Sequence, residues 1–177
     1  LFEWDGYASI GIDHFARPND ALAVAAAHGT LRRNFQGYTD DTAPVLVGLG
    51  ASSISRFPQG YAQMNAATSG WSKAVRAGEW ATTRGHALSP RDRLHARIIE
   101  ALMCDFAVST DELLRDHDIS RASLDQLFAP VAEKFGDFLV HCDQGLSIPV
   151  AGRPLTRVIA THFDDYAMAR TGHSSAI

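Results

Sequence analysis

The apolar run PVLVGLG at residues 44–50 limits the possible folds of this chain more than any other feature. A run this short, with no polar side chain, is typical of a strand that is buried on both faces of a parallel sheet. The small polar segment ASSIS follows it at residues 51–55. Glycine lets a backbone approach a ligand closely, and serine supplies a small donor. The sequence therefore predicts a buried strand that leads into a loop, although the spacing is not that of a phosphate-binding loop.

Residues 1–62 are predicted to form an α/β segment. The stretch YASIGIDHFA is rich in β-branched and aromatic types and predicts a strand. The Ala-rich stretch DALAVAAAHG predicts a helix, with Asn19 or Asp20 as its N-cap and Gly29 as its C-terminal stop. A loop or short strand, LRRNFQGYTDD, precedes the apolar run. The order of strand, helix and strand indicates one βαβ unit, and hence a piece of a larger sheet or barrel.

Residues 63–87 are predicted to form a helical connector, and residues 88–177 a mainly helical domain. Ser89 as N-cap and Pro90 at the first helical position begin the first helix of that domain. Two capping boxes predict further helix starts: Ser109 with Glu112, and Ser123 with Gln126. Pro130 is expected to kink or split the helix that follows the second box.

The segment DFLVHCDQGLSIPV predicts a hairpin around residues 143–145, and a final helix, GRPLTRVIATHFDDYAMA, closes the domain. Three helices, a β-ribbon and a last helix follow one another in the order of a winged-helix module. Such modules often bind DNA, which requires a basic face. The third helix and its flank carry two basic and two acidic residues, Arg121 and Lys134 against Asp125 and Glu133, and the ribbon carries two aspartates and no Lys or Arg. The charges therefore favour a structural or covering role over DNA binding.

The composition is that of an ordinary globular protein, with 177 residues, 46% hydrophobic and 20% charged. The net charge of −4 gives no electrostatic reason to expect nucleic acid or an anionic membrane as partner. No apolar run approaches the roughly 20 residues of a membrane span, and no signal peptide is visible. The two cysteines, Cys104 and Cys142, are expected to be reduced, and cannot by themselves hold a metal cluster.

Several side chains could carry chemistry. Asp13 and His14 follow a predicted strand, where a histidine oriented by a carboxylate can move protons, or where the pair can simply cap a turn. Four arginines lie in the loops around the strands and could bind a substrate with several carboxylates, or remain solvated on the surface: Arg17, Arg32, Arg33 and Arg56. From residue type alone, Ile54 is expected to pack. The residues indicate no Ser-His-Asp set, no catalytic carboxylate pair and no metal-ligand spacing.

Three motifs nevertheless resemble a known family. The stretches IGIDHFARPND, RNFQGYT and GLGASSISRFPQGYAQ are similar to those of the oxygen-independent coproporphyrinogen III oxidases, which are radical S-adenosylmethionine enzymes. The resemblance continues through DRLHARIIEALMCDF into the final helix and covers essentially the whole chain. It implies the C-terminal two fifths of such an enzyme, ending at its natural terminus. Related haem chaperones have an HNxxYW-like stretch where this chain has RRNFQGYTD, which favours the oxidase.

The resemblance implies a fold and an activity. Residues 1–62 would be the last strands of a partial TIM-like radical S-adenosylmethionine barrel, and residues 88–177 a winged-helix-like domain that flanks or covers its mouth. The full enzyme would oxidatively decarboxylate two propionates of coproporphyrinogen III to vinyl groups, giving protoporphyrinogen IX for haem synthesis. A 4Fe–4S cluster would cleave S-adenosylmethionine to start the radical chemistry. The CxxxCxxC motif that binds the cluster is absent here, so this fragment is expected to hold no catalytic or metal-ligating residue and to be inactive alone.

The resemblance also implies site residues and partners. Ile54 matches a family contact to S-adenosylmethionine, and Arg33 and Arg56 are hypothesised to meet substrate carboxylates. The expected partners are coproporphyrinogen III and an unidentified electron donor, in a cytoplasmic monomer without nucleic acid. Two alternatives stay open: a haem-binding chaperone of the same superfamily, and a winged-helix nucleic-acid-binding module.

Overall fold

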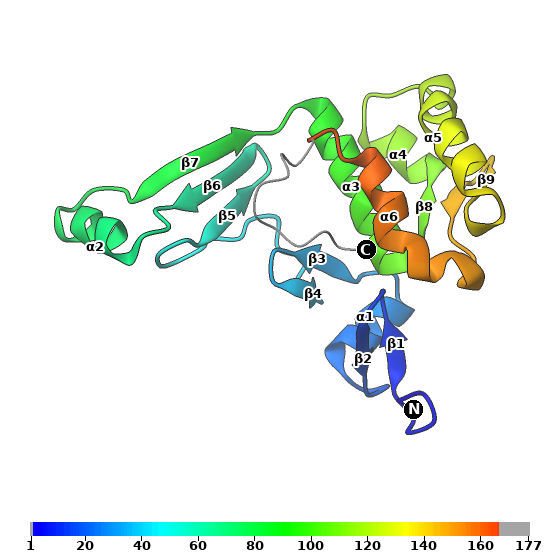
Figure 1. Ribbon diagram of the computed structural model, residues 1–177, viewed down its shortest axis with the longest axis horizontal. Coiled ribbons are helices and arrows are strands. Elements are labelled where there is room, and N and C mark those ends of the chain that lie inside the picture. Colours follow the sequence, from blue (N-terminus) through cyan, green and yellow to red (C-terminus); the bar gives the residue numbers. More distant parts are fainter. Residues whose placement is uncertain (1, 167–177) are drawn as a thin grey trace. The chain divides into compact units, whose positions relative to one another are not determined.

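The computed structural model describes residues 2–166, which fall into two compact units, Leu1–Leu94 and His95–Ile177 (Figure 1). Each unit is described by itself. Residue 1 and residues 167–177 lie outside the described residues. The end of the predicted helical domain and the last residues of its predicted final helix fall in that range.

Unit 1 begins with a hairpin and a short helix. Strands β1 (Ala8–Ile10) and β2 (His14–Ala16) pair antiparallel, and α1 (Ala21–Ala27) follows. The Asp20 carboxylate accepts a hydrogen bond from the backbone N–H of Leu22 at 2.9 Å, which satisfies one of the unpaired donors of the first helical turn. Gly29 has φ +65°, a conformation that suits glycine just after a helix. Both predicted ends of this helix are confirmed.

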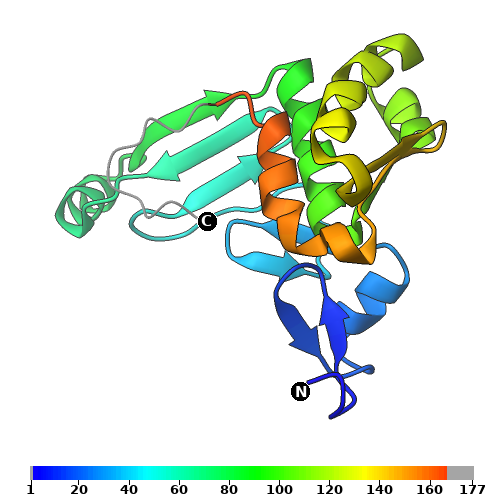
Figure 2. The same ribbon diagram turned by 45° about the vertical axis from the view of Figure 1, so that its right-hand side comes forward.

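Two further antiparallel elements complete unit 1. Strands β3 (Arg32–Asn34) and β4 (Gly37–Thr39) form a second hairpin. Strands β5 (Ile54–Phe57), β6 (Gly60–Met64) and β7 (Thr82–Ala87) form a sheet in the order β5-β6-β7, with α2 (Thr68–Arg76) between β6 and β7 in the chain (Figure 2). The predicted helical connector is thus only partly correct, because its last residues form β7.

The predicted buried strand at residues 44–50 is wrong. Within it, only Leu46 pairs with a neighbour, in an isolated antiparallel bridge to Arg56, and every strand pairing among residues 2–166 is antiparallel. Val47 and Leu49 are 60% and 85% exposed. A strand buried in a parallel sheet needs a parallel neighbour, and the described part of the chain supplies none.

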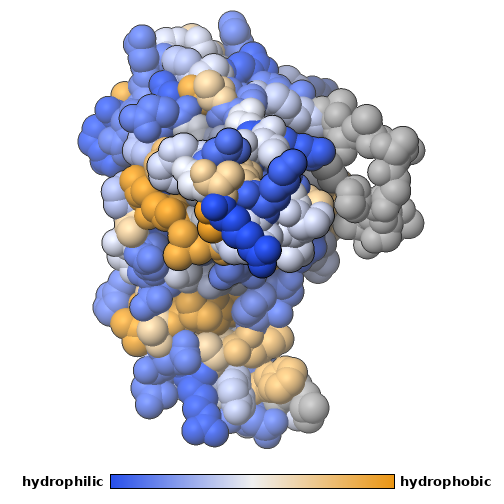
Figure 3. Space-filling model, turned by 90° about the vertical axis from the view of Figure 1, so that its left-hand side faces the viewer, coloured by the Kyte–Doolittle hydropathy of each residue, from blue (hydrophilic) through white to orange (hydrophobic). Residues whose placement is uncertain are grey.

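The end of unit 1 that carries α2 shows hydrophobic surface, orange in Figure 3.

Unit 2 alternates helices with short strands. Helix α3 (Pro90–Asp105) crosses from unit 1, and its start is confirmed: the Ser89 hydroxyl accepts the N–H of Asp92 at 3.1 Å, and the Asp92 carboxylate accepts the N–H of Ser89 at 2.8 Å. The elements that follow are β8 (Ala107–Ser109), α4 (Thr110–Asp116), α5 (Arg121–Phe135), β9 (Val140–Cys142), β10 (Gly145–Ser147) and α6 (Thr156–Ala160). The strands form an antiparallel sheet in the order β8-β10-β9.

Helix α5 departs from the prediction at its start and in its middle. Its N-cap is Ser120, whose hydroxyl accepts the N–H of Ser123 at 3.1 Å, so the predicted box of Ser123 with Gln126 is wrong. The helix also runs unbroken through Pro130. A proline removes the hydrogen bond to the carbonyl four residues earlier, and both Pro130 and Gln126 are exposed, so water can satisfy that carbonyl.

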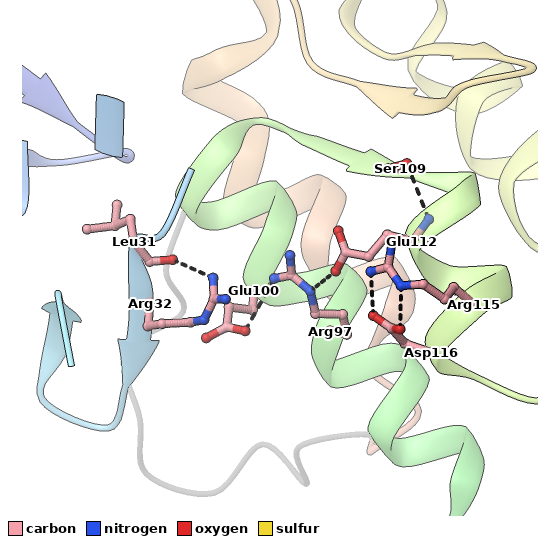
Figure 4. Close-up of polar contacts among 8 residues, drawn as sticks. All are labelled: Leu31, Arg32, Arg97, Glu100, Ser109, Glu112, Arg115 and Asp116. Atoms are coloured by element: carbon pink, nitrogen blue, oxygen red, sulfur yellow. Dashed lines mark hydrogen bonds and ion pairs between the residues drawn. The ribbon is translucent and has the colours of Figure 1, made fainter. Parts of the chain in front are cut away.

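The start of α4 is confirmed and is linked to α3 by an ion-pair network (Figure 4). The Ser109 hydroxyl accepts the N–H of Glu112 at 3.4 Å. Arg97 donates to the Glu112 carboxylate, and to Glu100 at 3.3 Å. Burial lowers the pKa of Arg97, but the hydrogen bond to Glu112 and the charges of Glu112 and Glu100 outweigh it and raise the pKa above its usual value. Arg97 therefore stays charged and ties the two helices together.

Beneath this network lies the apolar core of unit 2. Phe128 and Phe163 meet edge to face, with ring centroids 6.1 Å apart. The fully buried side chains come from helices and strands alike: Ile98, Leu102, Leu113, Leu124, Phe128, Leu146, Ile159 and Phe163.

Candidate functional site

Asp13 and His14 form a hydrogen-bonded pair at the first hairpin. The Nδ1 atom of His14 lies 2.8 Å from Asp13 Oδ1, and the two side chains are 48% and 42% exposed. A carboxylate bonded to one ring nitrogen fixes the orientation of an imidazole and leaves the other nitrogen directed away from it. The pair predicted from the sequence is therefore an oriented histidine near the surface.

Tyr38 joins this hairpin to the second one. Its ring meets the His14 ring edge to face at 5.0 Å, and its hydroxyl oxygen accepts the N–H of Ile12 at 3.0 Å. Gly11 has φ +54°, and a Cβ there would lie 2.2 Å from the Tyr38 ring. Only glycine fits that position, so the close contact of Tyr38 with the first hairpin depends on it.

A small cavity with a positive lining lies beside the second hairpin. Its volume is about 100 Å³. Arg32, Arg33 and Arg56 border it, and Asp41 is the one acidic residue in its lining. The other lining residues are Asn34, Thr39, Thr42, Ala43, Pro44, Val45 and Leu46. Three arginines against one aspartate give the lining of this cavity the opposite sign to the chain as a whole, whose net charge is −4.

Arg56 is held beside this cavity by backbone hydrogen bonds to Leu46, another residue of the lining. It exchanges two backbone hydrogen bonds with Leu46, of 2.8 and 2.9 Å. On the other side of β5 it lies directly opposite Tyr61, whose ring meets Phe35 at 5.2 Å. Phe35 belongs to the turn between β3 and β4, so this aromatic contact brings the second hairpin to the face of the sheet that carries Arg56.

Ile54 is the first residue of β5, opposite Gln63. The N–H of Met64 donates to the Ser53 carbonyl at 2.9 Å. Because hydrogen-bonded and non-bonded pairs alternate in an antiparallel ladder, the backbone polar groups of Ile54 point away from β6. They point towards Gly48, where an added Cβ would lie 2.7 Å from the Ile54 carbonyl oxygen.

The structure thus brings together some of the predicted site residues and separates others. Ile54 and Arg56 lie two residues apart on one strand, so their side chains share a face, roughly 7 Å apart. Arg33 lies opposite Tyr38, with its guanidinium 5.0 Å from the ring centroid. Arg17 does not border the cavity.

Sequence analysis did not identify Tyr38. The pattern RRNFQGYT holds a usable signal, because a two-residue turn at Phe35 and Gln36 fixes the register of the hairpin and places Tyr38 opposite Arg33.

The described residues do not fit a metal cluster. Between residues 2 and 166, no group of three or more His, Cys, Asp or Glu could hold a metal ion. Cys104 is buried, Cys142 is exposed, and no disulfide joins them. A 4Fe–4S cluster needs four ligands, normally thiolates, so this part of the chain does not supply them. No helix in the same range is long and apolar enough to cross a membrane.

Comparison with known proteins gives consistent matches. The chain is 59% identical over 177 residues to the oxygen-independent coproporphyrinogen III oxidase of Paracoccus denitrificans and 38% identical over 166 residues to that of Escherichia coli K12. It covers 39% and 36% of these two relatives, and they cover 100% and 91% of it. No family model matches the chain.

A solved structure agrees with the sequence matches. It is the coproporphyrinogen III oxidase of Escherichia coli, described as a radical SAM enzyme, and it aligns with a TM-score of 0.84 at 35% identity. The alignment covers 94% of this chain and 39% of the other. The chain therefore spans about two fifths of the length of the proteins it matches.

Proposed function

This chain is homologous over its whole length to the oxygen-independent coproporphyrinogen III oxidases, and we propose that it is part of such an enzyme. The whole enzyme converts two propionates of coproporphyrinogen III to vinyl groups with loss of carbon dioxide, giving protoporphyrinogen IX in haem synthesis. The observation that carries this proposal is the 59% identity over all 177 residues. We further propose that the enzyme is a cytoplasmic monomer with an electron donor still to be identified.

A direct test is anaerobic turnover by the full-length enzyme that contains this chain. Supplied with coproporphyrinogen III, S-adenosylmethionine and a low-potential chemical reductant, it should form protoporphyrinogen IX, measured by chromatography after oxidation to the porphyrin. A reconstituted enzyme that leaves both propionates intact would refute the proposal.

The cofactors of the whole enzyme would be a 4Fe–4S cluster and S-adenosylmethionine, which supply the radical chemistry. Because the described residues do not provide the cluster ligands, we expect those cysteines on the part of the enzyme that this chain does not span.

What this chain would contribute is a backbone contact to S-adenosylmethionine at Ile54. The support is geometric: the strand-edge polar groups of Ile54 face the Gly48 segment rather than β6. Donors and acceptors in that position can bind a polar ligand without disturbing the sheet.

Arg33 and Arg56 are proposed to contact carboxylates of the substrate, since both border the positive cavity. We predict that Arg33→Ala and Arg56→Ala in the full-length enzyme each weaken substrate binding about tenfold or more, because a hydrogen bond to a charged group contributes roughly 1.5–3 kcal/mol. The Michaelis constant for coproporphyrinogen III measures this. An unchanged constant for either variant would remove that arginine from the site.

We propose that the chain has three parts. Residues 1–62 are the C-terminal end of a catalytic barrel, residues 63–87 connect this barrel to the next domain, and residues 88–177 form a winged-helix-like domain. The order α3, β8, α4, α5, β9, β10, with the sheet order β8-β10-β9, supports the winged-helix description. In this proposal the domain covers the mouth of the barrel and excludes water from a reactive intermediate.

The covering role predicts the effect of a truncation. An enzyme that ends near Leu88 should lose product formation, or should consume S-adenosylmethionine without forming product, because the reaction is no longer shielded. The ratio of S-adenosylmethionine cleaved to product formed checks this. Normal coupled turnover by the truncated enzyme would contradict a covering role.

The same topology keeps a second candidate open, since winged-helix modules often bind nucleic acid. Here the charges oppose it, with Arg121 and Lys134 balanced by Asp125 and Glu133 on α5. Salt-dependent binding in a DNA shift assay would favour the module, and tight haem binding without decarboxylation would favour a haem chaperone.

A further inference from the structure

The second hairpin presents its two arginines on opposite faces. Arg33 is paired directly with Tyr38, and Arg32 with Thr39. Since successive side chains of a strand point to opposite faces, Arg32, Asn34 and Thr39 share one face, and Arg33 and Tyr38 share the other. The cavity lining includes Arg32, Asn34 and Thr39 from the first face, and Arg33 but not Tyr38 from the second. Most of the hairpin residues in the lining therefore come from the face of Arg32, while Arg33 borders the cavity with its guanidinium over the Tyr38 ring.

Arg56 approaches the same cavity from the sheet. Leu46 is its partner in the antiparallel bridge, so the two side chains lie on the same side, and Leu46 also lines the cavity. Arg32 and Arg56 thus border the cavity from two separate elements. The structure shows Arg32 donating to the Leu31 carbonyl at 3.2 Å (Figure 4), which uses one of its five donors.

The acidic residue in the lining is already engaged. The Asp41 carboxylate accepts the N–H of Ala43 at 2.8 Å, and the backbone N–H of Asp41 donates to the Thr39 hydroxyl at 3.0 Å. These bonds shape the loop that closes the cavity, so Asp41 has a structural role there. The uncharged polar residues of the lining are Asn34, Thr39 and Thr42.

The volume of the cavity limits what it can hold. This volume is about 100 Å³. Whole small-molecule ligands usually occupy pockets of roughly 300–1,000 Å³. The cavity is smaller than that, so its size suits one acid group better than a whole macrocycle.

We propose that Arg32 and Arg56 form a carboxylate subsite that takes one propionate arm of the tetrapyrrole substrate. The identity of the acid rests on the proposed function, whereas the preference for a carboxylate rests on the cavity itself. One guanidinium group can bind a carboxylate in a planar, bidentate manner, and a second adds positive charge beside it. Arg56 lies on the same face of β5 as Ile54, so an arm held here would lie beside the proposed S-adenosylmethionine contact. Arg32 is the residue that this proposal adds to the site.

Binding of two matched porphyrins tests the subsite in the full-length enzyme. Coproporphyrin III carries four carboxylates, and its tetramethyl ester has the same macrocycle without the charges. Porphyrin fluorescence titrations in dilute detergent should show that Arg32→Ala and Arg56→Ala bind the free acid at least tenfold more weakly than wild type. All three proteins should bind the ester equally. Arg32→Lys should fall between wild type and Arg32→Ala, because lysine keeps the charge but loses the planar fork.

Arg84→Ala is the matched control, since Arg84 lies on exposed strand β7 of the same sheet and does not border the cavity. Binding of the free acid by Arg32→Ala that equals that of Arg84→Ala would overturn the subsite. An equal loss of ester binding would overturn it too, because it would show a structural effect. A wild-type enzyme that binds the free acid through Arg32 yet leaves the propionates of coproporphyrinogen III intact would refute the proposed function and keep the subsite.

Discussion

Single atoms decide the geometry of the site at two glycines. At Gly11 a Cβ would run into the Tyr38 ring, and at Gly48 it would lie 2.7 Å from the carbonyl oxygen of Ile54. Gly48 does not have a positive φ, so its requirement is close backbone approach rather than conformation. Gly48, the first glycine of GLGASS, is thus needed for the close approach of the Ile54 backbone. Residue type alone does not reveal this role.

This contact makes a prediction at the residue scale. Gly48→Ala should force the Ile54 backbone to move, at a cost of about 1–3 kcal/mol typical of overpacking. In the full-length enzyme it should also weaken the binding of S-adenosylmethionine. Denaturant unfolding and equilibrium dialysis measure the two effects.

Gly85→Ala is the control, because its added Cβ would lie 3.3 Å from the Tyr61 carbonyl oxygen and needs only a small shift. If Gly48→Ala is destabilised but binds S-adenosylmethionine as tightly as Gly85→Ala, the backbone of Ile54 is not the cofactor contact.

Among the secondary-structure elements, helix starts were predicted well where the cap is local. Asp20, Ser89 and Ser109 all cap the helices expected of them. The prediction failed at α5, because Ser120 and Ser123 both satisfy the local preference for an N-cap. The choice between them depends on where the preceding turn ends, and that is set by packing of Leu124 and Phe128 in the core.

The cap of α5 gives a prediction at the element scale. Ser120→Ala should lower the free energy of unfolding by about 1 kcal/mol, because it leaves the N–H of Ser123 without its acceptor. Ser123→Ala should change it by only a few tenths of that, since its backbone N–H remains capped. Urea unfolding of the two variants side by side makes the comparison, and a larger loss for Ser123→Ala would contradict the assignment.

At the scale of the whole molecule, the chain spans only about two fifths of its relatives. Two cysteines, one of them buried in unit 2, cannot supply the ligands of a 4Fe–4S cluster. In addition, the apolar side chains of Val47 and Leu49 are exposed, although their segment was predicted to be a buried strand. Both features agree with the proposal that this chain is part of a larger enzyme, whose other parts would supply the cofactor ligands and the neighbouring strands.

A reconstitution experiment checks this at the same scale. Anaerobic treatment of this chain with iron and sulfide should give no 4Fe–4S absorbance and no oxidase activity, whereas the full-length enzyme should give both. Cys142→Ser controls for adventitious iron at the exposed thiol. A stable cluster on the chain alone that persists in this variant would contradict the expectation.

The sequence by itself determined the local structure and the resemblance to a family: the ends of α1, the starts of α3 and α4, the hairpin around residues 143–145, and three motifs similar to one group of oxidases. These depend on residues close together in the chain. Only the tertiary structure decided that residues 44–50 form no buried strand, that Tyr38 joins two hairpins, and that Arg32 shares a face of its hairpin with Asn34 and Thr39 beside the cavity. The reason is that strand pairing and register depend on partners distant in the chain, and a shift of one residue moves a side chain to the opposite face.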